Sequence, residues 1–215
     1  MIRTTDQLID RIAGDLVWRR RELTDMRALV QESSSQLRCR VVIRAAVALL
    51  YAHWEGFVKS TSSFYLEFVA SHRIPYRKLA PNFVGLSLRS KYFELGASEK
   101  ISSGNLLADF FCTSLDAQSR VPYKNVVDTK SNLSSKVLLD ILAAPGLDHS
   151  QFETRLRFID SSLVSPRNHI AHGEDLSLKV AEYLELHDDV IALIELFRNE
   201  VENSSVLRRF ERAAV

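Results

Sequence analysis

The sequence predicts an all-α protein, and three observations support this fold class. Glycine and proline are scarce, since the 215 residues include only 7 Gly and 5 Pro, under half of the roughly 12% found in average proteins. Apolar residues recur at three- and four-residue spacing over long stretches, which is typical of helices buried on one side. No stretch of the sequence alternates apolar and polar residues as a half-buried strand does.

The first two predicted helices are long. Thr4 and Gln7 have the spacing of a capping box, which satisfies free backbone N–H groups at the start of a helix. Apolar positions then continue at helical spacing as far as Val30. Ser33 and Gln36 repeat the capping pattern, so a second helix is predicted from there to about residue 70.

Residues 71–147 are predicted to form a helical insertion or cap. Pro75 and Pro81 bracket a basic and aromatic connector, the most loop-like part of the chain. The helices predicted within and after this insertion cover residues 84–95, 103–115, 134–143, 148–163 and 177–209. Residues 1–215 are thus expected to form one domain, a bundle of long antiparallel helices that carries the insertion.

The overall charge excludes a polycation, because 28 basic residues face 27 acidic ones, a formal net charge of +1. Charge is nevertheless segregated along the sequence. Residues 71–100 carry six Lys and Arg against two Glu, and residues 174–202 carry nine acids against two bases. Solvated helix faces explain both stretches. Docking of a basic partner on the acidic stretch is the alternative.

Cysteine usage and apolar runs predict a cytoplasmic protein without a membrane partner. Cys39 and Cys112 lie far apart and are expected to be buried thiols in a reducing compartment. The first residues show no apolar signal segment. The longest apolar stretch, residues 41–51, contains Arg44 and is shorter than the roughly 20 residues that cross a bilayer.

Neither a metal nor a cofactor is predicted. His169 and His172 are three residues apart, whereas a helical zinc pair has a spacing of four, and the two cysteines show no ligand spacing. The glycine-rich phosphate loops, the dinucleotide-binding fingerprint and the nucleophile elbow are all missing from the sequence.

The most polar segment is Ser165-Pro-Arg-Asn-His-Ile-Ala-His-Gly-Glu174, between the last two predicted long helices. Ser165 is a good N-cap and Pro166 suits the first position of a helix, while Gly173 is a natural stop. A short helix is therefore predicted here, and its N-terminus would favour an anion.

The side chains of this segment suit phosphate chemistry. Asn168 and His172 are four residues apart and share a helix face, and the long side chain of Arg167 reaches the same region. Arginine holds phosphate and stabilises developing negative charge, while histidine transfers protons near neutral pH. A base that deprotonates an RNA 2′-hydroxyl lets it attack the adjacent phosphate without a metal. Alternatively, Arg167 forms an ion pair with the acidic stretch, and His172 is a satisfied histidine at a helix end.

The segment from Arg167 to His172 resembles the Arg-Asn-x3-His signature of the HEPN superfamily, whose all-α domains include many metal-independent ribonucleases. Two further segments, Ala52-His-Trp-Glu-Gly-Phe-Val-Lys59 and Asn132-Leu-Ser-Ser-Lys136, are similar to the branch related to the RiboL-PSP-HEPN group. Members of this branch are associated with bacterial toxin–antitoxin and phage-defence loci. The three segments occur in order and span most of the chain.

The resemblance implies a role for each motif residue. Arg167 would bind and polarise the scissile phosphate, His172 would transfer protons, and Asn168 would orient both. Glu55 would face the motif and pair with its arginine, although an ion pair with Lys59 on a solvated face is the alternative. Two motifs would meet across a homodimer as a composite site, and cleavage would leave a 2′,3′-cyclic phosphate and a 5′-hydroxyl.

The basic connector and insertion are expected to bind the RNA backbone, because phosphate contacts give affinity without sequence choice. The residues expected to do so are Arg73, Arg77, Lys78, Arg89 and Lys91. A competing hypothesis is a non-catalytic HEPN dimer that scaffolds an assembly by binding a nucleotide, RNA or a protein. A further possibility is an active nuclease held silent by an antitoxin or a sensor protein.

Overall fold

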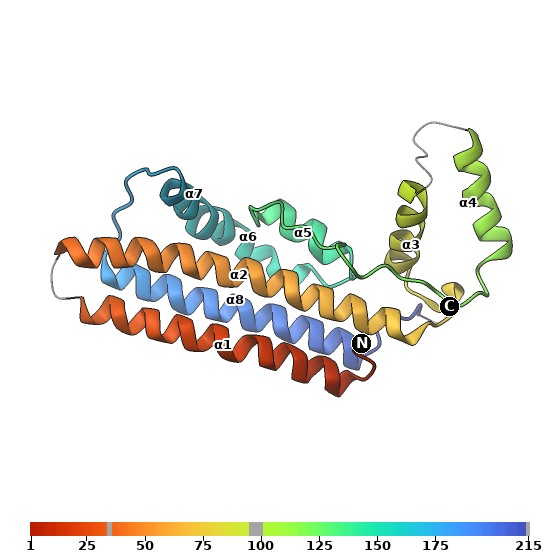
Figure 1. The fold of residues 1–215 in the computed structure, drawn as a ribbon, viewed down its shortest axis with the longest axis horizontal. Helices are drawn as coiled ribbons and strands as arrows, with labels where there is room; N and C mark the ends of the chain where they lie inside the picture. The colour runs from red at the N-terminus through yellow and green to blue at the C-terminus, as the bar shows by residue number, and fades with distance from the viewer. Residues whose placement is uncertain (34–35, 95–100, 214–215) are drawn as a thin grey trace.

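The computed structural model describes residues 1–33, 36–94 and 101–213, and it confirms the all-α prediction, with no β-strand among these residues. Three long helices lie side by side: α1 (Thr5–Glu32), α2 (Gln36–His72) and α8 (Val180–Val206). Figure 1 shows that α1 runs antiparallel to both α2 and α8, which are parallel to each other. Because α2 and α8 are parallel, the chain between them must return along the bundle.

The predicted cap at the start of the first helix is confirmed. The Thr4 hydroxyl accepts a hydrogen bond from the Gln7 N–H at 3.2 Å, as predicted for the start of α1. The predicted cap of the second helix, formed by Ser33 and Gln36, spans residues 34–35, which lie outside the described residues. Ser33 is the C-cap of α1. Its hydroxyl donates to the Leu29 carbonyl at 2.8 Å and therefore belongs to the last turn of α1.

The core of the bundle is rich in aromatic side chains. Trp54 and Phe57 of α2 meet Phe197 of α8, and Phe152 packs on Phe197 from the other side, with ring centroids 6.0–6.4 Å apart. All four side chains are fully buried. Burying one side chain of this size contributes roughly 1.5–3 kcal/mol, so these rings fix how α2 and α8 pack.

The interface between α1 and α2 holds a buried polar cluster. The Arg19 side chain donates to the Asp15 carboxylate at 2.8 Å and to the His53 carbonyl at 3.4 Å, and the Ser60 hydroxyl donates to Asp15 at 2.7 Å. A Cβ atom on Gly56 would lie 2.8 Å from Arg19 Nη1. Glycine at this position therefore lets the guanidinium pack against α2.

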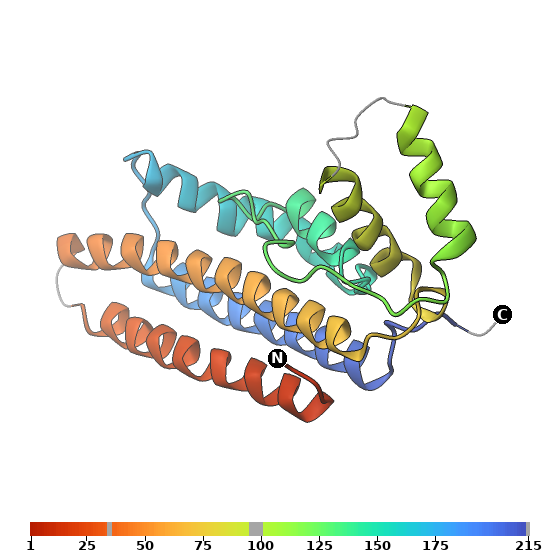
Figure 2. The ribbon, with the colours of Figure 1, turned by 45° about the vertical axis from the view of Figure 1, so that its right-hand side comes forward.

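The return connection forms a second layer along α2 (Figures 1 and 2). It contains α5 (Ser135–Ala143) and a helical run made of η2 (Ser150–Arg155), α6 (Leu156–Phe158), η3 (Ile159–Val164) and α7 (Ser165–Ala171). The short η1 (Tyr76–Lys78), α3 (Pro81–Glu94) and α4 (Ile101–Thr113) lie at the C-terminal end of α2. In both views α3 and α4 stand away from the three long helices.

The structure changes the expectation for the two cysteines. The thiol of Cys112 is exposed and that of Cys39 is half-buried, so the prediction of buried thiols is wrong.

Residues 38–72 of α2 form one helix that is long and apolar enough to cross a membrane, with a mean hydropathy of 1.4 in its most apolar window. Half of that window is buried inside the fold, and packing against α1 and α8 accounts for its apolar character.

The acidic stretch 174–202 makes ion pairs within the fold. Asp175 pairs with Arg40 of α2, and α1 supplies two more arginines to α8. The pairs between α1 and α8 are Arg20 with Glu195 and Arg27 with Asp188. Three of the nine acids in this stretch thus pair with arginines of α1 and α2.

Candidate active site

The polar segment 165–174 forms α7 and the start of the following loop, but Ser165 is the first residue of α7 and not an N-cap that starts a new helix. Val164 and Ser165 both have helical backbone angles, and the chain is helical from Ser150 onward. The N-cap prediction is therefore wrong. Since Pro166 has no N–H to donate to the preceding turn, residues 159–164 adopt the wider π-helical geometry just before it.

Tertiary contacts explain why the chain stays helical before α7. The Asp160 carboxylate accepts hydrogen bonds from the backbone N–H and the hydroxyl of Ser135, at 2.8 and 2.6 Å. Leu163 and Val164 are buried. The motif lies inside this longer helical run, so no free helix N-terminus is present there to attract an anion.

The end of α7 places His172 at the surface. Gly173 ends the helix as predicted, with a φ of +74° that favours glycine. Its N–H donates to the Ile170 carbonyl at 3.1 Å, and the Glu174 N–H donates to the His169 carbonyl at 2.8 Å. His172 is the last residue before this turn, and its exposed imidazole makes no hydrogen bond or ion pair with another described residue.

Arg167 is half-buried and held by three contacts. Its guanidinium carbon lies 4.7 Å from the centre of the Tyr51 ring. One terminal nitrogen donates to the Ser131 carbonyl at 2.8 Å, and the other donates to the Asn168 side-chain oxygen at 3.0 Å. Within the described part of the chain no carboxylate pairs with Arg167, so the alternative of an ion pair with the acidic stretch is not seen.

Tyr51 of α2 anchors this arrangement. Its side chain is buried, and its hydroxyl accepts a hydrogen bond from the Leu133 N–H at 2.5 Å. Burial raises the pKa of Tyr51 to about 12, and the nearby negative charge of Glu55 contributes in the same direction. Tyr51 is therefore a neutral phenol at physiological pH, and its ring offers a face to the guanidinium of Arg167.

Three stretches of the chain thus meet at Arg167: α2 at residue 51, the loop at residues 131–133, and α7. A family model described as RiboL-PSP-HEPN matches residues 15–203 and includes all three. The chain belongs to the RiboL-PSP-HEPN family. HEPN domains are all-α and are generally associated with ribonucleases. Comparison with curated proteins and with solved structures found no match.

Glu55 lies near the HEPN motif without touching its arginine. It is half-buried on α2, one helical turn after Tyr51, and its carboxylate acts on the pKa of the Tyr51 hydroxyl. Among the described residues, Glu55 makes an ion pair neither with Arg167 nor with Lys59. Glu55 therefore lies beside the Tyr51 hydroxyl, on the same side of α2 as the motif.

His169 differs from His172, although both belong to the same HEPN motif segment. Its Nδ1 atom lies 2.7 Å from the Ser165 carbonyl oxygen, and its Nε2 atom lies 3.4 Å from a Glu174 carboxylate oxygen. Both ring nitrogens thus have local partners. In the described ranges, no cluster of three or more His, Cys, Asp or Glu side chains is arranged to hold a metal ion.

The five basic residues expected to bind RNA lie elsewhere in the HEPN fold. Arg73, Arg77 and Lys78 follow the C-terminal end of α2, and Arg89 is exposed on α3. Arg77 forms an ion pair with Asp116. The Lys91 side chain lies outside the described part of the structure. At 1.5 Å per helical residue, the end of α2 is about 30 Å from Tyr51, so Arg73, Arg77 and Lys78 are not brought to Arg167 within one protomer.

Three site residues were missed by sequence reasoning: Tyr51, Ser131 and Leu133. Ser131 and Leu133 contribute backbone groups, which residue types do not reveal, and Ser131 has a left-handed φ of +52°. Tyr51 did carry a signal, because it lies four residues before Glu55 and therefore shares its helix face.

Proposed function

We propose that this HEPN domain is a metal-independent endoribonuclease whose active site is centred on Arg167 and His172. One observation carries the proposal: the oriented guanidinium of Arg167 lies on α7, and the exposed imidazole of His172, which has no partner among the described residues, lies at the C-cap of the same helix. Arg167 has five N–H donors, and its hydrogen bonds to Asn168 and Ser131 use two of them. Three donors stay free for a phosphate, and His172 is free to exchange protons with a substrate.

The proposed reaction is a transesterification within the RNA strand. A base removes the proton of the 2′-hydroxyl, and the 2′-oxygen attacks the adjacent phosphorus while the bond to the 5′-oxygen breaks. The departing 5′-oxygen takes up a proton, which leaves a 2′,3′-cyclic phosphate and a 5′-hydroxyl. Arg167 stabilises the charge that develops on the phosphate oxygens, His172 transfers a proton, and Asn168 orients Arg167 through its side-chain oxygen.

A homodimer with a composite site suits this chemistry. In an in-line displacement the attacking and leaving oxygens lie on opposite sides of the phosphorus, so the base and the acid must also lie on opposite sides. One exposed His172 imidazole reaches only one side at a time. A second copy of the motif facing the first would supply the other imidazole, and Glu55 would act on the site through Tyr51.

The proposed biological role is that of a toxin or phage-defence effector that acts on cytoplasmic RNA. Single-stranded or looped RNA is the expected target, because unstacked bases are accessible there. Such a nuclease requires control, so an antitoxin or a sensor protein is the expected partner. Arg73, Arg77, Lys78, Arg89 and Lys91 would contact RNA only at a distance from the cleaved bond.

A non-catalytic scaffold is the second candidate, and one observation favours it. Arg167 links α7 to the loop at Ser131 and to Tyr51 of α2, which is a structural task in itself. The scaffold needs this link but has no use for a free His172. Substitution of His172 therefore separates the two candidates better than substitution of Arg167.

The deciding experiment is incubation of purified protein with total RNA and tRNA in EDTA, followed by analysis of the fragment ends. The nuclease proposal expects cutting by the wild type, with cyclic-phosphate ends, and none by His172→Ala. His149→Ala is the matched control, because His149 is also exposed but lies outside the motif. Equal cutting by wild type and His172→Ala would refute the proposal. An absence of cutting by either protein on every RNA would favour the scaffold.

A further inference from the structure

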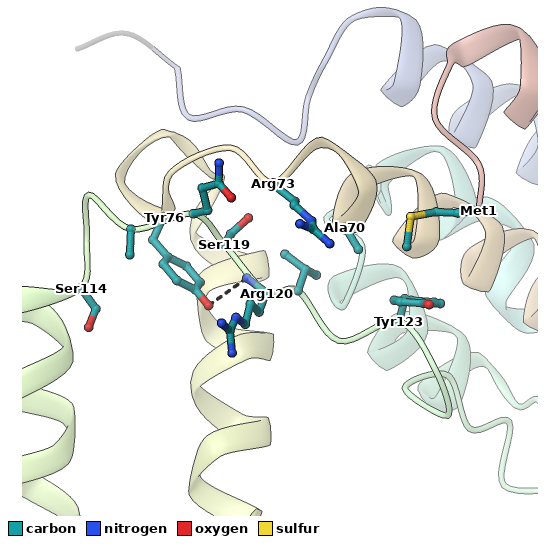
Figure 3. Close-up of a pocket in the computed structure, with 11 residues that line it drawn as sticks. Met1, Ala70, Arg73, Tyr76, Ser114, Ser119, Arg120 and Tyr123 are labelled. Carbon is teal, nitrogen blue, oxygen red and sulfur yellow. Dashed lines mark hydrogen bonds between the residues drawn. The ribbon is translucent and has the colours of Figure 1, made fainter.

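A second candidate site lies at the opposite end of α2 from the motif. A cavity of about 700 Å³ opens where the C-terminal end of α2 meets residues 114–123. This volume is in the range of small-molecule sites, roughly 300–1,000 Å³. Figure 3 shows side chains from several segments converging on it, including Arg73, Arg120 and Tyr123.

Two arginines give the cavity positive charge. Arg73 and Arg120 line it, and none of its 11 lining residues is acidic. Neither arginine makes an ion pair with any described residue. By contrast, the neighbouring Arg77 is paired with Asp116 and does not line the cavity. Two unpaired guanidinium groups in one cavity favour an anionic ligand with several oxygen acceptors.

The wall that carries Arg120 is fixed by backbone hydrogen bonds. The Tyr76 N–H donates to the Ala117 carbonyl at 3.3 Å, and the Ser119 N–H donates to the Ile74 carbonyl at 3.1 Å. The Arg120 N–H donates to the Tyr76 hydroxyl at 3.0 Å, as the dashed line in Figure 3 shows. The two arginines, 47 positions apart in sequence, are therefore held on a preformed frame.

Two further features of the wall point toward a ligand. The Ser119 hydroxyl is buried and has no hydrogen-bond partner among the residues that the structure describes, and Figure 3 shows it beside Arg73. Arg73 itself has a left-handed φ of +47° directly after α2, where glycine or asparagine is the usual residue. Arginine there is unfavourable for the backbone, yet its side chain lines the cavity.

We propose that this cavity binds a small organic phosphate. Its phosphate group would lie between the Arg73 and Arg120 guanidinium groups, and its organic part would lie against the apolar wall formed by Ala70, Val121 and Tyr123. The site is separate from the nuclease motif, so it stands whether or not the chain cuts RNA. The same phosphate chemistry has two sources, a free small molecule and the terminal phosphate of an RNA strand.

Calorimetric titration of the full chain at low salt tests the proposal, with AMP, inorganic pyrophosphate and adenosine as probes. AMP and pyrophosphate should bind saturably, and adenosine, which lacks the phosphate, should not. Arg120→Gln and Arg73→Asn should each weaken binding about 10- to 100-fold, the loss expected for a hydrogen-bonded charged group. Asparagine tolerates the left-handed φ at position 73, so this variant keeps the fold.

The controls separate this site from the motif. Arg77→Gln removes a neighbouring cation outside the cavity and should bind AMP like the wild type, and so should His172→Ala. If neither AMP nor pyrophosphate binds, or if Arg73→Asn and Arg120→Gln both bind with wild-type affinity, the proposal is overturned. If a 5′-phosphorylated RNA trinucleotide binds while AMP does not, the two arginines bind the terminal phosphate of an RNA strand, and the small-molecule site is refuted.

Discussion

The two sides of α2 between residues 51 and 60 use polar residues in opposite ways. On the side that faces α1, His53 is 3% exposed, lies 2.7 Å from a Glu22 carboxylate oxygen, and is surrounded by the Arg19 and Asp15 cluster. On the side that faces the motif, Tyr51 supports Arg167, while His172 of the motif is exposed and has no partner in the described part of the chain. Residue type alone therefore does not assign a role to a histidine. Burial and partners do.

This contrast separates two kinds of variant. Where a polar group is buried and paired, its removal leaves another buried group without a partner and lowers the free energy of unfolding. Where a group is exposed and unpartnered, its removal leaves the fold intact and acts only on the proposed chemistry. The α1 side should thus respond in stability assays, and the motif side should respond in cleavage assays.

The largest expected effect is on cleavage by variants of Arg167. Arg167→Ala should lower the initial rate of RNA cleavage in EDTA about 10²- to 10³-fold, as loss of a group that stabilises transition-state charge does. Arg167→Lys should recover little, because an ammonium group lacks the planar fork of donors. Arg157→Ala, an exposed arginine on the same helical run, is the control. Cleavage by Arg167→Ala within threefold of wild type would contradict the assignment.

The next effect is on stability, at the buried pair on the α1 side. Arg19→Met should lower the free energy of unfolding by about 3 kcal/mol, because it leaves the Asp15 carboxylate without its cation. For a chain of this length that corresponds to a fall of about 6–12 °C in Tm. At temperatures well below its Tm, Arg19→Met should still cleave RNA.

Arg21→Met is the matched control for Arg19, since Arg21 is exposed on the same helix. It should change stability by less than about 0.5 kcal/mol. The contrast between the two sides of α2 would break down if Arg19→Met were as stable as the wild type but unable to cut RNA.

A smaller effect should appear at Tyr51, which is buried on the side of α2 that faces the motif. Tyr51→Phe removes the acceptor of the Leu133 N–H. A buried donor without a partner should lower the free energy of unfolding, measured in urea, by about 1–3 kcal/mol. The ring stays beneath Arg167, so cleavage should fall less than tenfold. Tyr51→Leu removes the ring as well and should reduce cleavage further. If Tyr51→Phe were as inactive as Arg167→Ala, the phenol hydroxyl would have to take part in the chemistry.

The smallest effect is on the pH dependence of stability. Burial lowers the pKa of His53, although Glu22 acts in the opposite direction. The unfolded chain therefore takes up a proton near the ordinary pKa of about 6.5, before the folded chain does. Stability should be complete above that pH and fall as the pH drops below it, by at most about 1.4 kcal/mol per pH unit.

Urea unfolding at pH 7.5, 6.5 and 5.5 measures this contribution. His53→Gln should lose less stability between pH 6.5 and 5.5 than the wild type, because it carries no titrating ring. His149→Gln, at an exposed position, should keep the wild-type pH dependence. Identical pH slopes for His53→Gln and the wild type would show that His53 does not titrate as its burial predicts.

The parts of this fold that sequence could predict are those set by local rules. Thr4 caps α1 as its sequence pattern indicates, and Gly173 ends α7. Ser165 has the same local pattern but lies inside a helical run, because Asp160 bonds to Ser135 of another segment. Local patterns cannot show such tertiary contacts.

The candidate site was predictable to a similar degree. The family resemblance indicated Arg167 and His172, whereas the support of Arg167 comes from Tyr51, 116 residues earlier, and from a backbone carbonyl at Ser131. Contacts over such separations, and contacts made by backbone atoms, leave no periodicity in the sequence. The distance between the basic residues after α2 and the motif likewise follows from the length of α2, not from residue types.

The most direct test of the central claim is a comparison of histidines in one assay. The rate constant for cutting a short single-stranded RNA in EDTA would be measured for the wild type, His172→Ala, His169→Ala and His149→Ala, each shown to have a wild-type Tm. We expect the rate constant of His172→Ala to fall about 10²- to 10⁴-fold, as for removal of a general acid or base, and that of His149→Ala to equal the wild-type value. A wild-type rate for His172→Ala would contradict the central claim.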